Sequence, residues 1–185
     1  MQAPQAGHFW KTPFIWEPGC TEPPADASLN FISAPQAWLV SAIGQVMSAS
    51  LDESDHHAVQ VLGAEGAAED LLSSWPTYFE NPPGWWRVAE DARGRMVGFV
   101  LPVLFKDRAE WKEGKPQGTI FYMGVLPQFR GRRYAKALVD EATRIFNGAE
   151  CWRIFCDASS RNTPMLQAFQ QAGYVARSPW QRPVA

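Results

Sequence analysis

The stretch from residue 119 to residue 146 constrains the fold more than any other part of this sequence. An apolar, β-rich run over 119–126 ends at Pro127, and a basic turn then leads into an amphipathic helix predicted over 132–146. A second apolar run follows over 152–156. A strand, a helix and a strand in this order form a right-handed crossover, so we expect the two strands to be parallel in one sheet.

Shorter segments complete one domain around this unit. Apolar runs over 85–90 and 96–105 flank a polar loop, which is typical of a β-hairpin, and Pro102 indicates an edge or a bulge in the second run. Further predictions are a strand over 30–33, a helix from Pro35, a helix over 55–72 that its glycines weaken or split, a short helix from Thr163 and a strand over 174–176. The sequence therefore predicts a single α/β (α+β) domain over residues 29–185.

Residues 1–28 are expected to differ from this domain. They contain five prolines and no apolar period, so we predict an irregular aromatic and proline-rich N-terminal arm. Its aromatic residues make it too apolar for a free tail. We expect it to pack on the body of the domain or on a partner subunit, and in the second case the protein would be a homodimer.

The overall charge argues against several classes of partner. Lys and Arg number 17 and Asp and Glu 19, a net charge of −2, whereas proteins that bind nucleic acid or anionic membranes usually carry a basic excess. The longest apolar run, over 98–105, is far shorter than a membrane span, and residues 1–20 lack the apolar region of a signal peptide. None of the three cysteines lies in a CxxC motif, so we expect no metal site and a reducing, cytoplasmic setting.

The turn before the predicted helix concentrates positive charge. Residues 130–136 include four cations, and no acidic residue occurs from 127 to 139. A helix N-terminus offers unpaired N–H groups and the positive end of its dipole, and Gly131 and Ala135 let a ligand approach the backbone closely. This combination favours a pyrophosphate, and a solvated basic helix start or an RNA-binding patch is the alternative that this segment alone leaves open.

A second motif follows the run over 152–156. Asp157 comes five residues before Asn162, which precedes a short helix carrying Phe169 and then Gly173-Tyr174. The two motifs together resemble the acetyl-CoA-binding half of the GCN5-related N-acetyltransferase (GNAT) family. That family's Q/R-x-x-G-x-G/A signature is matched by Arg130-Gly131-Arg132-Arg133-Tyr134-Ala135. Its later pattern of an Asn, an aromatic residue and Gly-Phe is matched by the second motif, and the resemblance spans about residues 85–176.

The resemblance implies a fold and a set of acetyl-CoA contacts. The fold is a central mixed, mostly antiparallel sheet with a splayed pair of parallel strands, flanked by helices on both faces. The pantetheine arm lies between the splayed strands, the first of which carries a bulge that we place at Gly124. The implied cofactor-binding residues are Met123, Gly124 and Val125 on the strand, Arg130, Gly131, Arg132, Arg133, Tyr134, Ala135 and Lys136 at the pyrophosphate, Asn162 at the pantetheine, and Phe169 beside the thioester.

Two positions depart from the family's pattern. Arg133 replaces the central glycine of the turn, and a helical φ would tolerate it because only the backbone amide is needed. Phe169 stands where many members carry a tyrosine that protonates the leaving thiolate, and Phe has no proton to give. A thiol titrates near pH ~8.5, so the thiolate is a good leaving group that can also take its proton from water. Tyr122 and Tyr174 are the nearest candidates to replace this acid, with packing aromatics as the alternative for both.

The resemblance also implies a base. Asp157 ends the strand at a position where several members carry a catalytic carboxylate, which would remove a proton from an amine acceptor. Capping of the following turn is the alternative role for Asp157, as helix capping is for Asn162.

The resemblance therefore implies an acetyl-CoA-dependent N-acetyltransferase that acts on a primary amine of a small molecule or peptide, by direct attack in a ternary complex. A CoA-binding module with little or no catalysis is the first alternative, and an RNA-binding domain is the second. The residues do not identify the acceptor.

Overall fold

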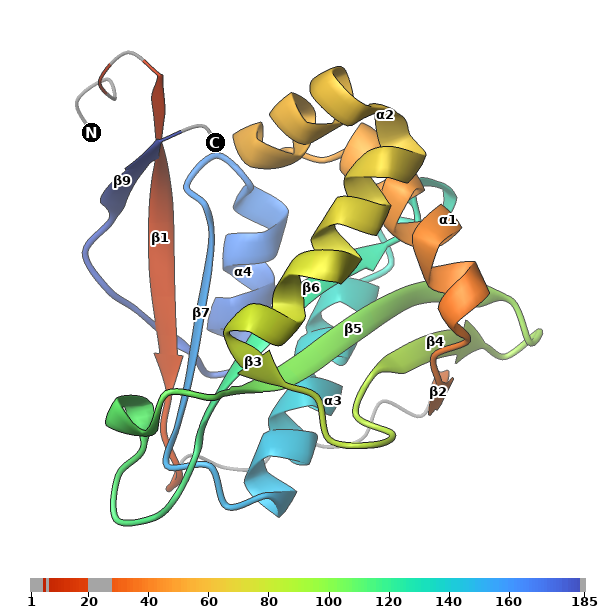
Figure 1. Ribbon diagram of the computed structural model, residues 1–185. Coiled ribbons are helices and arrows are strands. Elements are labelled where there is room, and N and C mark those ends of the chain that lie inside the picture. The colour runs from red at the N-terminus through yellow and green to blue at the C-terminus, as the bar shows by residue number, and fades with distance from the viewer. Residues whose placement is uncertain (1–4, 6, 20–27, 184–185) are drawn as a thin grey trace.

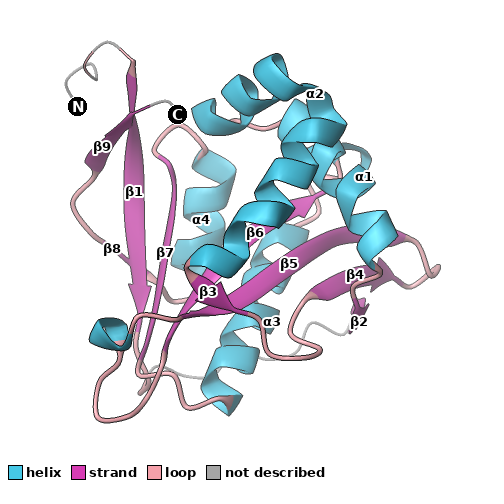
Figure 2. Cartoon of the chain, viewed as in Figure 1, coloured by secondary structure: helices cyan, strands magenta, loops and turns pink. Residues whose placement is uncertain are grey.

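The computed structural model describes residues 5, 7–19 and 28–183, which form a sheet with helices packed on it (Figures 1 and 2). The strands are β1 His8–Trp16, β2 Leu29–Ser33, β3 Phe79–Glu80, β4 Arg87–Asp91, β5 Met96–Phe105, β6 Gln117–Val125, β7 Arg153–Ser159, β8 Val175–Ala176 and β9 Trp180–Pro183. The α-helices are α1 Gln36–Ser48, α2 Glu53–Ser74, α3 Tyr134–Gly148 and α4 Thr163–Gln171. Short 3-10 turns occupy Trp75–Thr77, Arg108–Glu110 and Pro127–Phe129.

One mixed sheet contains all of these strands. Its order is β2-β4-β5-β6-β7-β1-β8, with β3 added to β5 and β9 added to β1. Neighbouring strands run antiparallel except for β6 and β7, which are parallel and are connected through α3. The structure confirms the predicted mixed, mostly antiparallel sheet and its parallel crossover.

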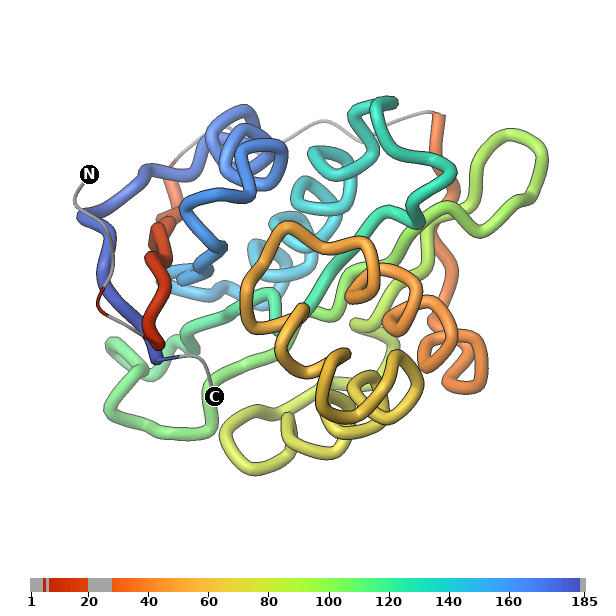
Figure 3. The backbone as a smooth tube through the Cα atoms, turned by 90° about the horizontal axis from the view of Figure 1, so that it is seen from above, coloured from red at the N-terminus to blue at the C-terminus, as the bar shows by residue number. Residues whose placement is uncertain are grey.

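Helices cover both faces of this sheet. Viewed from above, α1 and α2 lie on one side of the strands and α3 and α4 on the other (Figure 3). On α3, Leu138, Ala142 and Phe146 recur every four residues and are fully buried, which is the pattern of a helix that packs one stripe on a sheet. Leu39 and Ile43 do the same on α1, so each helix pair encloses its own apolar core.

The N-terminal arm was predicted to be irregular, and for residues 8–16 this prediction is wrong. β1 pairs antiparallel with β7 from Lys11 opposite Ser159 to Trp16 opposite Ile154, and it is an inner strand of the sheet. Phe14 and Trp16 are buried in the core beneath α3 and α4. Burial of these aromatic rings outweighs the β-breaking tendency of the one proline within the strand. Pro4, Cys20, Pro23 and Pro24 lie outside the described residues.

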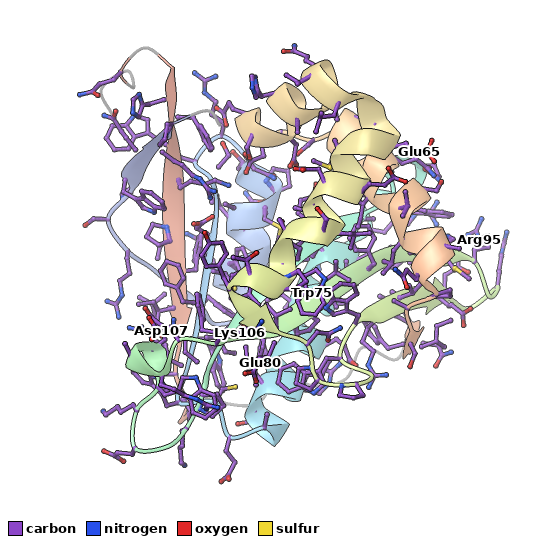
Figure 4. All side chains as sticks on the ribbon, viewed as in Figure 1. Glu65, Trp75, Glu80, Arg95, Lys106 and Asp107 are labelled. Atoms are coloured by element: carbon purple, nitrogen blue, oxygen red, sulfur yellow. The ribbon has the colours of Figure 1, made fainter. Side chains whose placement is uncertain are left out.

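The predicted weak point of the second helix is confirmed. α2 runs over 22 residues, and Gly63 has a φ of 74° that divides it into two helical parts. The predicted hairpin is also present as β4 and β5, with Arg95 near its tip, at the end of β4–β5 away from β7 (Figure 4). Within this sheet, the pairing between β6 and β7 is incomplete.

Candidate active site

β6 and β7 separate soon after they begin. Only Gln117 with Arg153 and Gly118 with Ile154 are paired, although β6 continues to Val125 and β7 to Ser159. One step further along, the Ile120 amide donates a long hydrogen bond of 3.5 Å to Cys156 Sγ in place of a backbone oxygen. The other edge of β7 is occupied by β1 (Figure 1). The two strands thus present unpaired backbone edges to each other, and such groups require a partner.

A bulge in β6 decides which backbone groups face this opening. The register between β5 and β6 shifts from Leu101 opposite Tyr122 to Pro102 opposite Ile120, which leaves Phe121 as the extra residue. The bulge therefore lies at Phe121 and not at Gly124, where we had placed it. Pro102 lies directly beside this shift in register, where the sequence predicted an edge or a bulge.

Two hydrogen bonds show the effect of the extra residue. The Ile120 amide points toward β7, whereas the Leu126 amide, six residues later, donates to Val97 of β5. In a regular strand, residues an even number apart face the same neighbour. Because the bulge shifts this alternation, the backbone groups of Met123 and Val125 face the opening.

Gly124 has a packing role. A Cβ built at this position would lie 2.5 Å from Cγ1 of Val46, on the α1 side of the sheet. By the same alternation, its amide faces β5. The absence of a side chain therefore lets α1 approach β6 closely, and a direct role of Gly124 in binding acetyl-CoA stays a prediction.

The basic turn follows β6 directly. Gly131 and Arg133 have φ values of 78° and 63°, both in the left-handed region. The expectation of a helical φ at Arg133 is wrong. The turn keeps the backbone that a glycine would adopt, at a cost of roughly 1–2 kcal/mol for a residue with a Cβ.

These dihedral angles leave a row of amides without partners. No side chain caps the N-terminus of α3, and its first turn carries no acidic residue. Within the described part of the chain, the backbone amides of residues 131–135 have no hydrogen-bond acceptor. Unpartnered amides at a helix N-terminus form an anion site, so the turn fits the diphosphate of acetyl-CoA.

Two of the cationic side chains of the turn have partners of their own. Arg130 donates from Nη1 to the carbonyl of Ala49 at 2.6 Å and from Nε to that of Val125 at 3.3 Å. Lys136 Nζ lies 2.5 Å from Asp140 Oδ2. The side chain of Arg130 thus ties the turn to the end of α1, while the amides face outward.

Asn162 and Phe169 both have structural contacts. The Oδ1 of Asn162 accepts a hydrogen bond from the Met165 amide at 3.3 Å and caps α4, as the alternative reading held. Phe169 stacks on Phe14 at 5.0 Å, contacts the Tyr174 ring, and is only 2% exposed. Contact of either residue with acetyl-CoA stays a prediction.

Asp157 lies in β7 beside a lysine from β1. Lys11 Nζ is 2.6 Å from Asp52 Oδ2 and 3.5 Å from Asp157 Oδ1. Burial alone would raise the pKa of Asp52, but Lys11 and the hydrogen bonds of Ser54 hold it below the ordinary value. The strand that we predicted to be part of an irregular arm therefore supplies the cation of this cluster.

Sequence reasoning missed one carboxylate that contacts the unpaired part of β6. Asp55, in the first turn of α2, is 8% exposed, and its Oδ2 accepts a hydrogen bond of 2.9 Å from the hydroxyl of Tyr122. Burial raises the pKa of Asp55, and Asp52 adds to this, while the hydrogen bonds of Ser50 and Tyr122 oppose it. No sequence signal distinguishes Asp55 from an ordinary acidic residue at a helix start, because its partner lies 67 positions away.

Two further properties bear on function. Among the described residues, no three His, Cys, Asp or Glu side chains gather as metal ligands. In the same part of the chain, no helix combines the length and apolar character that crossing a membrane requires.

Comparisons with known proteins agree on one family for this chain. The model of the acetyltransferase (GNAT) family matches residues 50–174. The mycothiol acetyltransferase of Propionibacterium freudenreichii is 26% identical over 122 residues, which cover 64% of this chain and 35% of that protein. The catalytic subunit NAA20 of the N-terminal acetyltransferase B complex of Arabidopsis thaliana is 24% identical over 107 residues, which cover 56% and 58%. The chain thus spans between a third and three fifths of these relatives.

Solved structures agree with this at the level of the fold. A GCN5-related N-acetyltransferase from Sphaerobacter thermophilus has a TM-score of 0.57 and 18% identity, with 97% of this chain and 54% of that chain covered. An aminoglycoside N-acetyltransferase in complex with CoA has a TM-score of 0.50 and 19% identity, with 82% and 90% covered.

Proposed function

The chain belongs to the acetyltransferase (GNAT) family, and from this premise we propose that it transfers the acetyl group of acetyl-CoA to a primary amine of a small molecule or peptide. Acetyl-CoA is the acyl donor of this family, and when bound it supplies an activated thioester. The chain's own residues must hold this donor, admit the amine and manage the protons.

The observation that carries the proposal is the opening between β6 and β7 with the basic turn at its end. Two unpaired strand edges can accept an extended arm that carries amides, because the edges then regain hydrogen bonds. The free amides of residues 131–135 lie where β6 ends, so one ligand can span both features. Pantetheine diphosphate combines an extended diamide arm with a double anion in this order.

We assign the roles along this path. The free backbone amides from Gly131 to Ala135 bind the diphosphate, whereas the Lys136 amide already donates to the Arg133 carbonyl at 3.1 Å. The groups of Met123 and the amide of Val125 that face the opening bind the pantetheine arm. Asn162 Nδ2, left over when Oδ1 caps α4, is the candidate donor from the opposite side. The sequence suggests Asp157 as the base, and the structure adds Asp55 as a second candidate carboxylate.

The two described cysteines support direct attack by the amine. Burial raises the pKa of Cys151 and of Cys156 to about 12, so both thiols stay protonated near neutral pH. A protonated buried thiol is a poor nucleophile and does not form an acyl-enzyme readily. These two thiols are therefore poor acyl acceptors, which supports passage of the acetyl group from the thioester directly to the amine within a ternary complex.

Two measurements test the proposed function. Isothermal titration with acetyl-CoA, followed by thiol release over a panel of small amines and peptides, should give saturable binding and amine-dependent turnover. Binding without turnover on any amine would favour the CoA-binding module. Absence of acetyl-CoA binding would contradict both readings and favour the RNA-binding alternative.

A further inference from the structure

Phe169 leaves the departing thiolate without an obvious proton donor in α4. Two tyrosines could replace it, and their surroundings differ. Tyr174 is 3% exposed and its hydroxyl lies 2.8 Å from Thr143 Oγ1, inside the core beneath α3. That hydroxyl already has its partner there, and Tyr174 also packs against Phe169 itself.

Tyr122 lies on the part of β6 that has no partner in β7. It directly follows the bulge at Phe121, and both side chains pack with the α1–α2 core. The bulge thus turns Tyr122 toward α2, where its hydroxyl donates to Asp55. Its backbone neighbour Met123 is one of the residues whose groups face the opening. Of the two tyrosines, Tyr122 is the one that lies next to the proposed donor path.

Asp55 has the surroundings of a base. It is nearly buried and accepts from hydroxyl groups, while the nearby ammonium of Lys11 is held by Asp52 and Asp157. Within the described residues Asp55 forms no ion pair of its own. The charged groups that act on the Asp55–Tyr122 pair are Lys11 from β1, Asp52 at the N-cap of α2 and Arg130 from the turn. Asp157 of β7 lies beside Lys11, and Glu53 accepts from Ser159.

We propose that Asp55 and Tyr122 are the proton-transfer pair of the acetyl transfer, an inference that rests on the proposed function. Asp55 accepts the proton that the neutral amine loses as its C–N bond to the acetyl carbon forms. Tyr122 donates its proton to the sulfur as the C–S bond breaks and its electron pair passes to sulfur. Asp55 then returns its proton to the Tyr122 oxygen, so one proton moves from nitrogen to sulfur and both residues regain their starting state.

The electrostatics support these directions. Burial raises the pKa of Asp55, which makes its carboxylate a stronger base than an exposed Asp. Burial, followed by the carboxylate of Asp55, raises the pKa of Tyr122 well above its usual value. Protonation of Asp55 by the amine removes the second of these causes, so the Tyr122 hydroxyl becomes a stronger acid at the stage when the thiolate leaves.

The first test is a set of variants assayed on the amine with the fastest thiol release. Asp55→Asn should lower kcat/KM about 10²–10⁴-fold, the range for removal of a general base, with little change in acetyl-CoA affinity. Tyr122→Phe should move the acidic limb of the kcat/KM profile to higher pH, because it removes a hydrogen bond that lowers the pKa of Asp55. Tyr174→Phe is the matched control. It should leave kcat/KM and the position of the acidic limb unchanged, while the loss of its hydrogen bond to Thr143 lowers the melting temperature.

The same variants separate catalysis from folding. Because the folded-state pKa of Asp55 lies above its unfolded value, ionised Asp55 reduces stability as pH rises above about 4. Asp55→Asn removes this cost and should therefore melt no lower than the wild type at pH 7. Loss of turnover with an undiminished melting temperature supports the proposal.

Two results would overturn it. One is that the wild type turns over an amine, Asp55→Asn keeps near-normal turnover, and Asp157→Asn loses turnover instead. In that case the proposed function would survive and only the Asp55–Tyr122 pair would be wrong. The other is a crystal structure with CoA in which the sulfur lies beyond hydrogen-bond reach of Tyr122 Oη. This second test needs no acceptor. A protein that does not bind CoA at all would remove the proposed function together with the pair.

Discussion

The basic turn and the Lys11 cluster are both candidate binding regions, but they are assembled in different ways. The turn occupies residues 130–136, one continuous segment at the start of α3. The cluster brings together Lys11 from β1, Asp52 at the N-cap of α2, Asp55 from α2, Tyr122 from β6 and Asp157 from β7. In the turn the backbone supplies the ligand groups, whereas in the cluster side chains do.

This difference separates local from global requirements. A helix start needs only a few residues in sequence order, so its chemistry can be read from the sequence. A buried ion pair and a buried carboxylate need the whole sheet in place before they exist. Loss of the buried Lys11–Asp52 ion pair should therefore affect global stability, and changes in the turn should affect chiefly ligand affinity.

The largest effect on stability is expected from Lys11→Met, which removes the cation of the Lys11 cluster. The side chains of Lys11 and Asp52 are 8% and 13% exposed, so the substitution leaves a buried carboxylate without its cation. We expect the free energy of unfolding, measured with urea, to fall by about 3 kcal/mol. Adding Asp52→Asn should restore much of the loss, and a double variant as unstable as the single one would contradict the role of this pair.

A smaller loss of unfolding free energy is expected from Gly124→Ala, on β6 where α1 packs against it. The new methyl group would lie 2.5 Å from Cγ1 of Val46, so α1 or the strand must move. Overpacking of this kind costs about 1–3 kcal/mol. In a Val46→Ala background the same substitution should cost little, and an equal cost in both backgrounds would show that Val46 is not the obstacle.

Gly131→Val tests the basic turn, the region formed by one continuous segment. Valine disfavours the φ of 78° by roughly 1–2 kcal/mol, and we expect the turn to relax and misalign its amides. The Kd for acetyl-CoA, measured by isothermal titration, should rise about tenfold. Gly94→Val is the matched control, since Gly94 has a φ of 71° at the hairpin tip. Equal losses of affinity in both variants would argue against an anion site in the turn.

The smallest effect on stability is expected at Asp91, whose hydrogen-bond partners all lie within four residues of it. Asp91 accepts hydrogen bonds from the side chain of Arg95 and from the amides of Arg93 and Arg95, and these lower its pKa to about 2. Its contribution to stability is present above pH ~4 and is lost as the pH falls through about 2. The gap in melting temperature between the wild type and Asp91→Asn should therefore close over this interval. A gap that stays constant would mean that Asp91 does not titrate in this way.

The parts of the fold that were predictable are those whose cause is local. The amphipathic stripe of α3 and the β4–β5 hairpin follow from periodicity and turn residues, and the structure confirms them. The split of α2 at Gly63 belongs to the same class. The position of β1 does not, because its residues pair with β7 residues that are 138 to 148 positions away.

The candidate site divides along the same line. The turn was found from its charges and its glycine, yet the left-handed φ of Arg133 was missed because an arginine gives no local sign of it. Asp55 was missed altogether, and Tyr122 was only one of two candidates, because their hydrogen bond exists only once α2 lies over β6.

The extra residue at Phe121 has one more consequence, which concerns the register of β6 against β5. If Phe121 stood opposite Leu101 in a regular ladder, no side chain would change its chemistry, yet the two edges of the strand beyond Ile120 would be interchanged. The carbonyls and amides that we propose bind an acyl carrier would turn inward to β5, and their neighbours would turn outward in their place. The register at this point therefore matters to the opening as much as any individual amino acid of the region.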